Sequence, residues 1–278
     1  MTTRLMMLLL GAALAGCTVR AILVTHCHAD HSPLAAWLTA ETGAPTVAFG
    51  PHGDDAWDIG EDPPDVRAAE ERDAAARRAA TDPDAGGAEE PVVEESTDRA
   101  FLPEVAVRTG DEVASGAGWV MTALHTPGHT SNHTCYTLDD GTTRTIFTGD
   151  HVMGWSTTVV SPPDGDMAAY LDSLRVVAGR RDDVAIPTHG PPIAGPARFV
   201  SELIDHRLQR ERQVLEAIRS GLGTIPEIVE VLYADVRREL FPPARRSVLA
   251  HVVKLVDDAA VAVEGSPLPR LDSRYRAM

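Results

Sequence analysis

Cysteine is scarce in this 278-residue chain, which contains only Cys17, Cys27 and Cys135. The three are odd in number and far apart in sequence, so they indicate neither a disulfide framework nor a cysteine-based zinc site. Long apolar runs are also missing. The most apolar stretch, residues 1–17, is shorter than the roughly 20 residues that cross a membrane. A hydrophobic content of 44% is still ample for a core, and the length fits one large or two modest domains.

Basic residues are few, 25 against 41 acidic residues, and the net charge is −16. Most of this acidity is local, because residues 54–100 carry 16 acidic and 5 basic side chains. That segment is rich in Ala, Pro and Gly, so we expect a solvated, partly disordered insertion with one short helix near Val66–Ala80. An acidic lid that repels polyanions is the alternative. Residues 200–278 are balanced, with 12 acids and 12 bases, and we expect no duplex DNA partner.

Metal-ligand side chains are concentrated in the stretch His26-Cys27-His28-Ala29-Asp30-His31, which follows the apolar run Ala21–Val24. Imidazole and carboxylate groups suit zinc and similar borderline cations. Side chains alternate along a strand, so His26 and His28 are expected on one face and Cys27 on the other. The pattern therefore predicts a metal site at the end of a strand.

Three later segments repeat the arrangement of an apolar strand followed by a ligand in a glycine-containing turn. Thr126–Thr130 supplies His129, Ile146–Asp150 supplies Asp150, and Ala185–Gly190 supplies His189. Glycine lets the backbone bend sharply beside a metal.

The order and spacing of these residues resemble the HxHxDH signature and later ligands of the metallo-β-lactamase fold hydrolases. By this resemblance, His26, His28 and His129 hold one metal, Asp30, His31 and His189 hold a second, and Asp150 bridges them. Two zinc ions are the default, and iron or manganese would suit the same ligands. Such a pair shares a water and lowers its pKa, which gives a hydroxide nucleophile near pH 7.

The resemblance implies an α/β (α+β) fold, the αββα metallo-β-lactamase sandwich, lacking here its first N-terminal strands. We assign residues 1–199 to this domain and residues 200–278 to a winged-helix domain. Helices are expected at Ser32–Gly43, Met167–Gly179, His206–Arg219, Thr224–Tyr233 and Arg246–Asp258, with a wing at Val261–Val263. Strands are expected at Thr46–Phe49, Val105–Arg108, Trp119–Leu124, Thr134–Leu138 and Arg144–Phe147.

Residues 1–17 allow two interpretations. The pattern of a charged start, an apolar middle and a small-residue site before Cys17 is that of a lipoprotein signal, which would anchor the chain through a lipid. The alternative is a helix over Thr3–Gly16 that packs on the sheet. We favour the helix and a cytoplasmic protein without membrane contact, because three extended residues between Cys17 and Ala21 span only about 10 Å.

Catalytic roles are assigned to Asp30, His133 and His151. The two histidines follow His129 and Asp150 closely, so either could donate a proton to a leaving group or support a ligand from behind. We expect hydrolysis of a small ester, thioester or lactone. The chain also resembles a bacterial subgroup with a C-terminal winged helix, related to an animal mitochondrial single-strand endoribonuclease. Cleavage of single-stranded RNA or another phosphodiester, an inactive N-terminally truncated remnant, and a homodimer therefore stay open.

Overall fold

The structure is a computed structural model of the chain, and it describes residues 7, 10–53, 57–69, 71–72 and 97–278. The chain divides into two compact units, which are described separately. The first contains the described residues up to 53 together with 97–158 and 169–204, and the second contains the described residues of 57–72 together with 159–168 and 205–278. Among the described residues, no helix is long and apolar enough to span a membrane.

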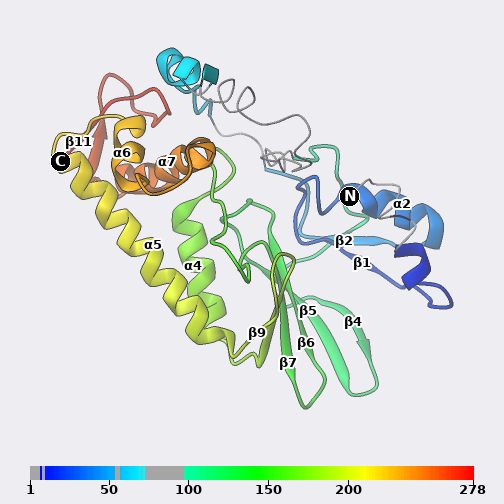
Figure 1. Cartoon of the computed structure of the whole chain (residues 1–278). Coiled ribbons are helices and arrows are strands. Elements are labelled where there is room, and N and C mark those ends of the chain that lie inside the picture. Colours follow the sequence, from blue (N-terminus) through cyan, green and yellow to red (C-terminus); the bar gives the residue numbers. More distant parts are fainter. Residues whose placement is uncertain (1–6, 8–9, 54–56, 70, 73–96) are drawn as a thin grey trace, which may run out of the picture. The chain divides into compact units, whose positions relative to one another are not determined.

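The first unit is built on two sheets (Figure 1). A small sheet pairs β1 (Ile22–Leu23), β2 (Thr46–Ala48) and β3 (Val105–Ala106) in parallel. The larger sheet follows chain order: β4 (Glu112–Gly116), β5 (Trp119–His125), β6 (Thr134–Asp139), β7 (Arg144–Gly149), β8 (Val184–Pro187) and β9 (Ile193–Ala194). Its pairs are antiparallel except β7 with β8. Helices α2 (Pro33–Thr42) and α4 (Met167–Ala178) complete the elements expected here.

The β6–β7 hairpin shows how local sequence sets this topology. The Asp140 carboxylate accepts hydrogen bonds from the backbone N–H groups of Thr142 and Thr143, at 2.9 and 2.8 Å. Gly141 takes a φ of 79°, in the region that favours glycine. These contacts close the turn between the two strands expected at Thr134–Leu138 and Arg144–Phe147.

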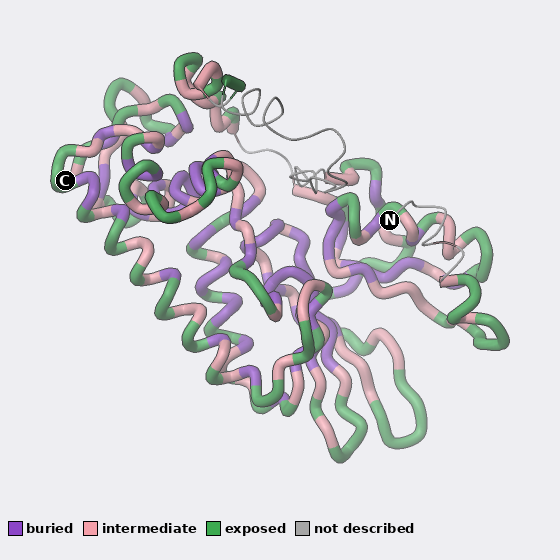
Figure 2. The backbone as a smooth tube through the Cα atoms, in the orientation of Figure 1, coloured by how far each residue is buried: buried purple, intermediate pink, exposed green. Residues whose placement is uncertain are grey.

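Tyr136 joins the two sheets beside the predicted metal ligands. Its side chain is buried, and its hydroxyl lies 3.0 Å from the carbonyl oxygen of Val24 and 2.9 Å from that of Val47. Tyr136 also packs with Val47 and Val107 in one buried cluster. Figure 2 shows the central strands of this unit as largely buried. The chain leaving β1 is therefore held against the larger sheet before the first histidine.

The second unit contains α6 (Ile225–Leu232), the short 3₁₀ helix η1 (Arg238–Leu240), α7 (Phe241–Asp257) and the hairpin β10 (Val261–Val263) with β11 (Tyr275–Ala277). A capping box begins α6, the helix expected over Thr224–Tyr233. Thr224 accepts from the backbone N–H of Glu227, and the Glu227 side chain accepts from the N–H of Thr224. Strand β10 is the predicted wing, and its partner β11 was not anticipated.

Several predicted boundaries were wrong. The helix expected from His206 is α5 (Pro196–Arg219), which begins ten residues earlier, and α7 begins five residues before Arg246. Both helices open near prolines, which fit a first helical turn because the missing N–H needs no partner there. The run expected to form a strand over Ala21–Val24 is strand only at Ile22–Leu23.

The acidic segment also differs from expectation where it is described. Residues 57–62 are hydrogen-bonded to other residues of the second unit, although the side chains of Asp58 and Glu61 are exposed. The Trp57 indole donates to the carbonyl oxygen of Pro269 at 3.0 Å, and the N–H of Leu271 donates to the carbonyl oxygen of Ile59 at 2.8 Å. Residues 64–69 and 71–72 are helical. The rest of the helix expected at Val66–Ala80 lies outside the described residues, as do residues 1–6 and 8–9 of the expected N-terminal helix, whose residues 10–13 are helical.

Candidate metal centre

Three histidines form the first half of the site. The Nδ1 atom of His28 lies 3.1 Å from the Nε2 atoms of both His26 and His129, and those two Nε2 atoms are 3.3 Å apart. All three side chains are buried. His26 and His28 lie in the connection between β1 and α2, and His129 lies in the turn after β5. The structure thus brings together the three nitrogen donors expected to hold one metal.

The turn that carries His129 depends on Gly128. This glycine has a φ of 136°, and a Cβ atom built on it would lie 2.3 Å from the Cα atom of Tyr170 in α4. The Ser173 hydroxyl of the same helix donates to the carbonyl oxygen of Pro127 at 2.8 Å. Helix α4 therefore supports the turn through backbone contact that only glycine permits.

Two carboxylates and two histidines form the second half. His189 Nε2 lies 3.2 Å from Asp30 Oδ2 and 3.6 Å from Asp150 Oδ1, and His31 Nε2 lies 3.4 Å from each of the same two oxygens. The other oxygen of Asp150, Oδ2, lies 3.9 Å from His129 Nε2. Asp150 thus stands between the two sets, as expected of a bridging ligand. Strands β7 and β8 are parallel neighbours, which places the turns that follow them at the same sheet edge.

The electrostatics suit divalent cations. Burial, followed by repulsion from neighbouring histidines, lowers the pKa of His28 to about 3 and that of His26 well below its usual value. These imidazoles are therefore neutral and present lone pairs. Burial by itself would lower the pKa of His31, but hydrogen bonds to Asp150 and Asp30 outweigh it and raise the pKa to about 9.

The carboxylates are correspondingly ionised. A hydrogen bond from His31 is the main cause that holds the pKa of Asp30 below its usual range. For Asp150, burial raises the pKa, but His31 and the other nearby histidines lower it by more. Neutral imidazoles at His26 and His28 and charged carboxylates at Asp30 and Asp150 suit zinc, iron or manganese. The raised pKa of His31 means that this imidazole would release its proton on binding a metal.

Comparison with known families identifies the superfamily of this chain. A family described as the metallo-beta-lactamase superfamily matches residues 2–189, and a beta-lactamase associated winged helix domain matches residues 224–270. The chain belongs to the metallo-beta-lactamase superfamily. The predicted fold class is confirmed, and the predicted enzyme class, a hydrolase of this superfamily, agrees with it.

Similar proteins align with this chain over different lengths. An atrochrysone carboxyl ACP thioesterase of Aspergillus chevalieri is 36% identical over 159 residues, which are 53% of this chain and 49% of the relative. A lactamase-like protein, nscB, of Trichophyton equinum is 33% identical over 179 residues, 58% of this chain and 52% of the relative. The chain spans about half the length of the curated relatives it matches. A crystal structure of a metallo-beta-lactamase family protein from Thermus thermophilus aligns with a TM-score of 0.66 and 26% identity, covering 99% of this chain and 86% of that one.

His133 occupies a supporting position in this metallo-beta-lactamase site. It is fully buried, and its Nε2 atom accepts the backbone N–H of Asp150 at 3.2 Å. The proton therefore resides on Nδ1, which donates to the Thr126 hydroxyl at 2.9 Å. Burial and the neighbouring His151 lower the pKa of His133. Of the two roles foreseen for His133, this geometry favours support of Asp150 over proton donation to substrate.

His151 is also fully buried, and burial lowers its pKa to about 3. Its ring lies 5.1 Å from the ring of Tyr170, whose hydroxyl donates to the His151 carbonyl oxygen at 3.0 Å. This arrangement favours a packing role behind Asp150, and a catalytic role for His151 stays a prediction. The contact of Thr126 with His133 and that of Tyr170 with His151 were not predicted. Neither has a local signal in the sequence, because each joins residues from separate elements.

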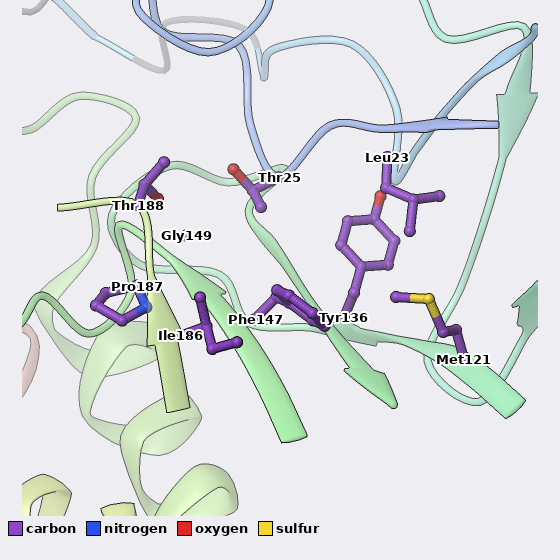
Figure 3. A pocket seen from close by; sticks show the side chains of 9 residues that line it. All are labelled: Leu23, Thr25, Met121, Tyr136, Phe147, Gly149, Ile186, Pro187 and Thr188. Carbon is purple, nitrogen blue, oxygen red and sulfur yellow. The ribbon is translucent and has the colours of Figure 1, made fainter. Parts of the chain in front are cut away.

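A mainly apolar pocket of about 280 Å³, open to solvent, lies beside the ligand-bearing segments (Figure 3). Three of its lining residues, Thr25, Gly149 and Thr188, each directly precede a predicted ligand, namely His26, Asp150 and His189. The remaining lining residues are Leu23, Met121, Tyr136, Phe147, Ile186 and Pro187. Neighbouring side chains of an extended chain point in opposite directions, so the residue before each of these three ligands lines the apolar pocket while the ligand itself points into the polar site.

Proposed function

We propose that this protein is a two-metal hydrolase that cleaves thioesters, with small esters and lactones as related substrates. One observation carries the proposal: seven imidazole and carboxylate side chains from separate segments of the chain converge in two sets that share Asp150. The two sets are His26, His28 and His129, and Asp30, His31 and His189.

Each set would hold one divalent metal, with Asp150 between them. When bound, such a metal pair supplies a hydroxide at neutral pH and polarises the scissile carbonyl group. Burial keeps His26 and His28 neutral and ready to ligate. Asp150 is held in place by the hydrogen bond from its N–H to His133.

Asp30 is placed to handle a proton. Its side chain is 58% exposed, which makes it the most open of the seven expected ligands, and its Oδ2 atom lies 3.2 Å from His189 Nε2. Because its pKa lies below the usual range, Asp30 would not retain a proton; its carboxylate would accept a hydrogen bond from the attacking water and pass the proton on to solvent.

The thioester class is supported by a relative that carries the name thioesterase. The charge distribution supports a small substrate over a polyanion, because phosphate contacts require clustered Lys and Arg side chains. The chain has 25 of these against 41 acidic residues. Single-stranded RNA is the competing substrate, suggested by the winged-helix domain.

The test is metal content combined with turnover in the purified protein. We expect close to two metals per chain by elemental analysis, with hydrolysis of N-acetylcysteamine thioesters detected by thiol release. Asp150→Asn and His129→Ala should lose metal and activity together, while His52→Ala, outside the cluster, should retain both. Less than one metal per chain would refute the proposal and support an inactive protein. Cleavage of a labelled RNA strand without thioester turnover would replace thioesters by phosphodiesters.

A further inference from the structure

The segment after Asp150 makes a tight excursion with an exposed tip. Val152 and Met153 are buried before the tip, Trp155, Ser156 and Thr157 are exposed, and Thr158 is buried after it. The Thr158 hydroxyl donates to the carbonyl oxygen of Asp150 at 2.6 Å and closes the base of the loop. Both ends of this loop are therefore held at Asp150, a predicted metal ligand.

The side of this loop is fixed to the turn that carries His189. The N–H of Gly154 donates to the His189 carbonyl oxygen at 2.8 Å. A Cβ atom on Gly190 would lie 2.7 Å from the Gly154 Cα atom, and one on Gly154 would lie 2.6 Å from the carbonyl oxygen of Pro191. The two backbones are thus in direct contact, and glycine at both positions permits it.

These contacts place the backbone of Trp155 close to the turn that carries His189. Consecutive Cα atoms are 3.8 Å apart, so the path through Gly154 and Gly190 puts the Trp155 Cα atom within about 12 Å of that of His189. The side chain of His189 is 35% exposed and that of Asp30 58%, whereas those of His31 and Asp150 are only 5% and 7% exposed. Solvent, and therefore substrate, reaches the site from the side of His189 and Asp30.

Trp155 itself is 72% exposed, although an indole ring is among the side chains that gain most from burial. An exposed tryptophan in a loop that is hydrogen-bonded on both sides, at Gly154 and Thr158, offers a flat apolar surface at small entropic cost.

We propose that Trp155 is a specificity-determining residue that binds the acyl group of the thioester and selects flat aromatic groups over short alkyl groups. The inference rests on the proposed function for its substrate, but it concerns a residue outside the metal ligands. Offset or edge-to-face packing of two rings accounts for the selection, because a methyl or ethyl group covers little of the indole.

The first test measures binding without turnover. The probes are S-benzyl-N-acetylcysteamine and S-ethyl-N-acetylcysteamine, thioethers that cannot be hydrolysed, titrated calorimetrically into the metal-loaded protein. We expect Trp155→Ala to weaken binding of the benzyl probe about ten-fold and that of the ethyl probe less than two-fold. Trp155→Phe should bind the benzyl probe almost as tightly as the wild type. Trp119→Ala is the matched control, because Trp119 is 38% exposed on β5. An unchanged benzyl affinity, equal weakening of both probes, or no binding of the benzyl probe to the wild type would each overturn the proposal.

The second test separates this inference from the proposed function. With benzoyl and acetyl thioesters of N-acetylcysteamine, Trp155→Ala should raise KM about ten-fold for the benzoyl substrate alone and leave kcat within about two-fold. If the wild type hydrolyses neither thioester but the benzyl probe still depends on Trp155, the proposed function fails and the binding role stands. If both substrates turn over and respond equally to Trp155→Ala, only the role of Trp155 fails.

Discussion

Removing the carboxylate of Asp62 should destabilise the second unit strongly. Arg245 in α7 is buried, and its guanidinium binds Asp62 through two hydrogen bonds, Nε to Oδ1 at 2.6 Å and Nη2 to Oδ2 at 2.9 Å. Breaking a fully buried pair costs roughly 3–5 kcal/mol, because the remaining charge loses its compensation. The Asp62 side chain is 17% exposed, so we expect Asp62→Ala to lower the free energy of unfolding by about 2–4 kcal/mol.

The control is a second acidic residue in the same segment. Asp58 pairs with Arg270 at 2.9 Å, but its side chain is 76% exposed. Solvent screens such a pair, so Asp58→Ala should have little effect on stability. Urea unfolding followed by far-UV circular dichroism and tryptophan fluorescence measures both variants.

A double variant tests whether the cost comes from the uncompensated charge. Replacing both partners, Asp62→Leu with Arg245→Met, should recover most of the stability lost in Asp62→Ala, because apolar side chains of similar volume need no partner. If Asp62→Ala has as little effect on stability as Asp58→Ala, the reasoning is refuted. That result would mean that residues 57–62 are not held against α7 in solution.

Three further predictions concern the site and its support. Gly128→Ala should lower the free energy of unfolding by about 3 kcal/mol or more and reduce metal content, because its Cβ would meet the Tyr170 backbone. Gly110→Ala is the control for backbone strain, because Gly110 has a φ of 91° but open space around it. A similar loss of stability in Gly110→Ala would show that the clash with Tyr170 is not the cause. Burial lowers the pKa of His251 to about 3, below its unfolded value near 6.5. The stability this group contributes is therefore complete above pH 6.5 and is lost as pH falls from 6.5 toward 3. His251→Met should remove up to about 1.4 kcal/mol per pH unit from the acid dependence of unfolding, and an unchanged profile would argue against a neutral buried imidazole. Chelation of the metal-loaded protein should lower the thermal midpoint, since a ligand at 100 times its Kd stabilises by about 2.7 kcal/mol, and His129→Ala should show a smaller shift in calorimetry.

Local signals predicted much of this fold. The capping box at Thr224 and Glu227 satisfies its own backbone groups, so α6 begins where the sequence indicates. Strands β5, β6 and β7 follow from short apolar runs between turn residues. The starts of α5 and α7 were predicted too late in the chain, although proline is tolerated in a first helical turn. The attachment of residues 57–62 depends on Arg245 and Pro269, about two hundred residues away, and acidic composition does not reveal such partners.

The sequence by itself determined which residues make the candidate metal centre, because each ligand type stands at the end of a strand in a recognisable turn. Only the tertiary structure decided how they are arranged. It placed Asp150 between two sets of ligands and brought the His133 ring within hydrogen-bond distance of the Asp150 N–H. It also brought Gly154 against Gly190, so that the backbone of Trp155 lies close to the turn of His189. These relations join separate strands and loops. They depend on the pairing of β7 with β8 and on packing against α4, and no local pattern of residues specifies either.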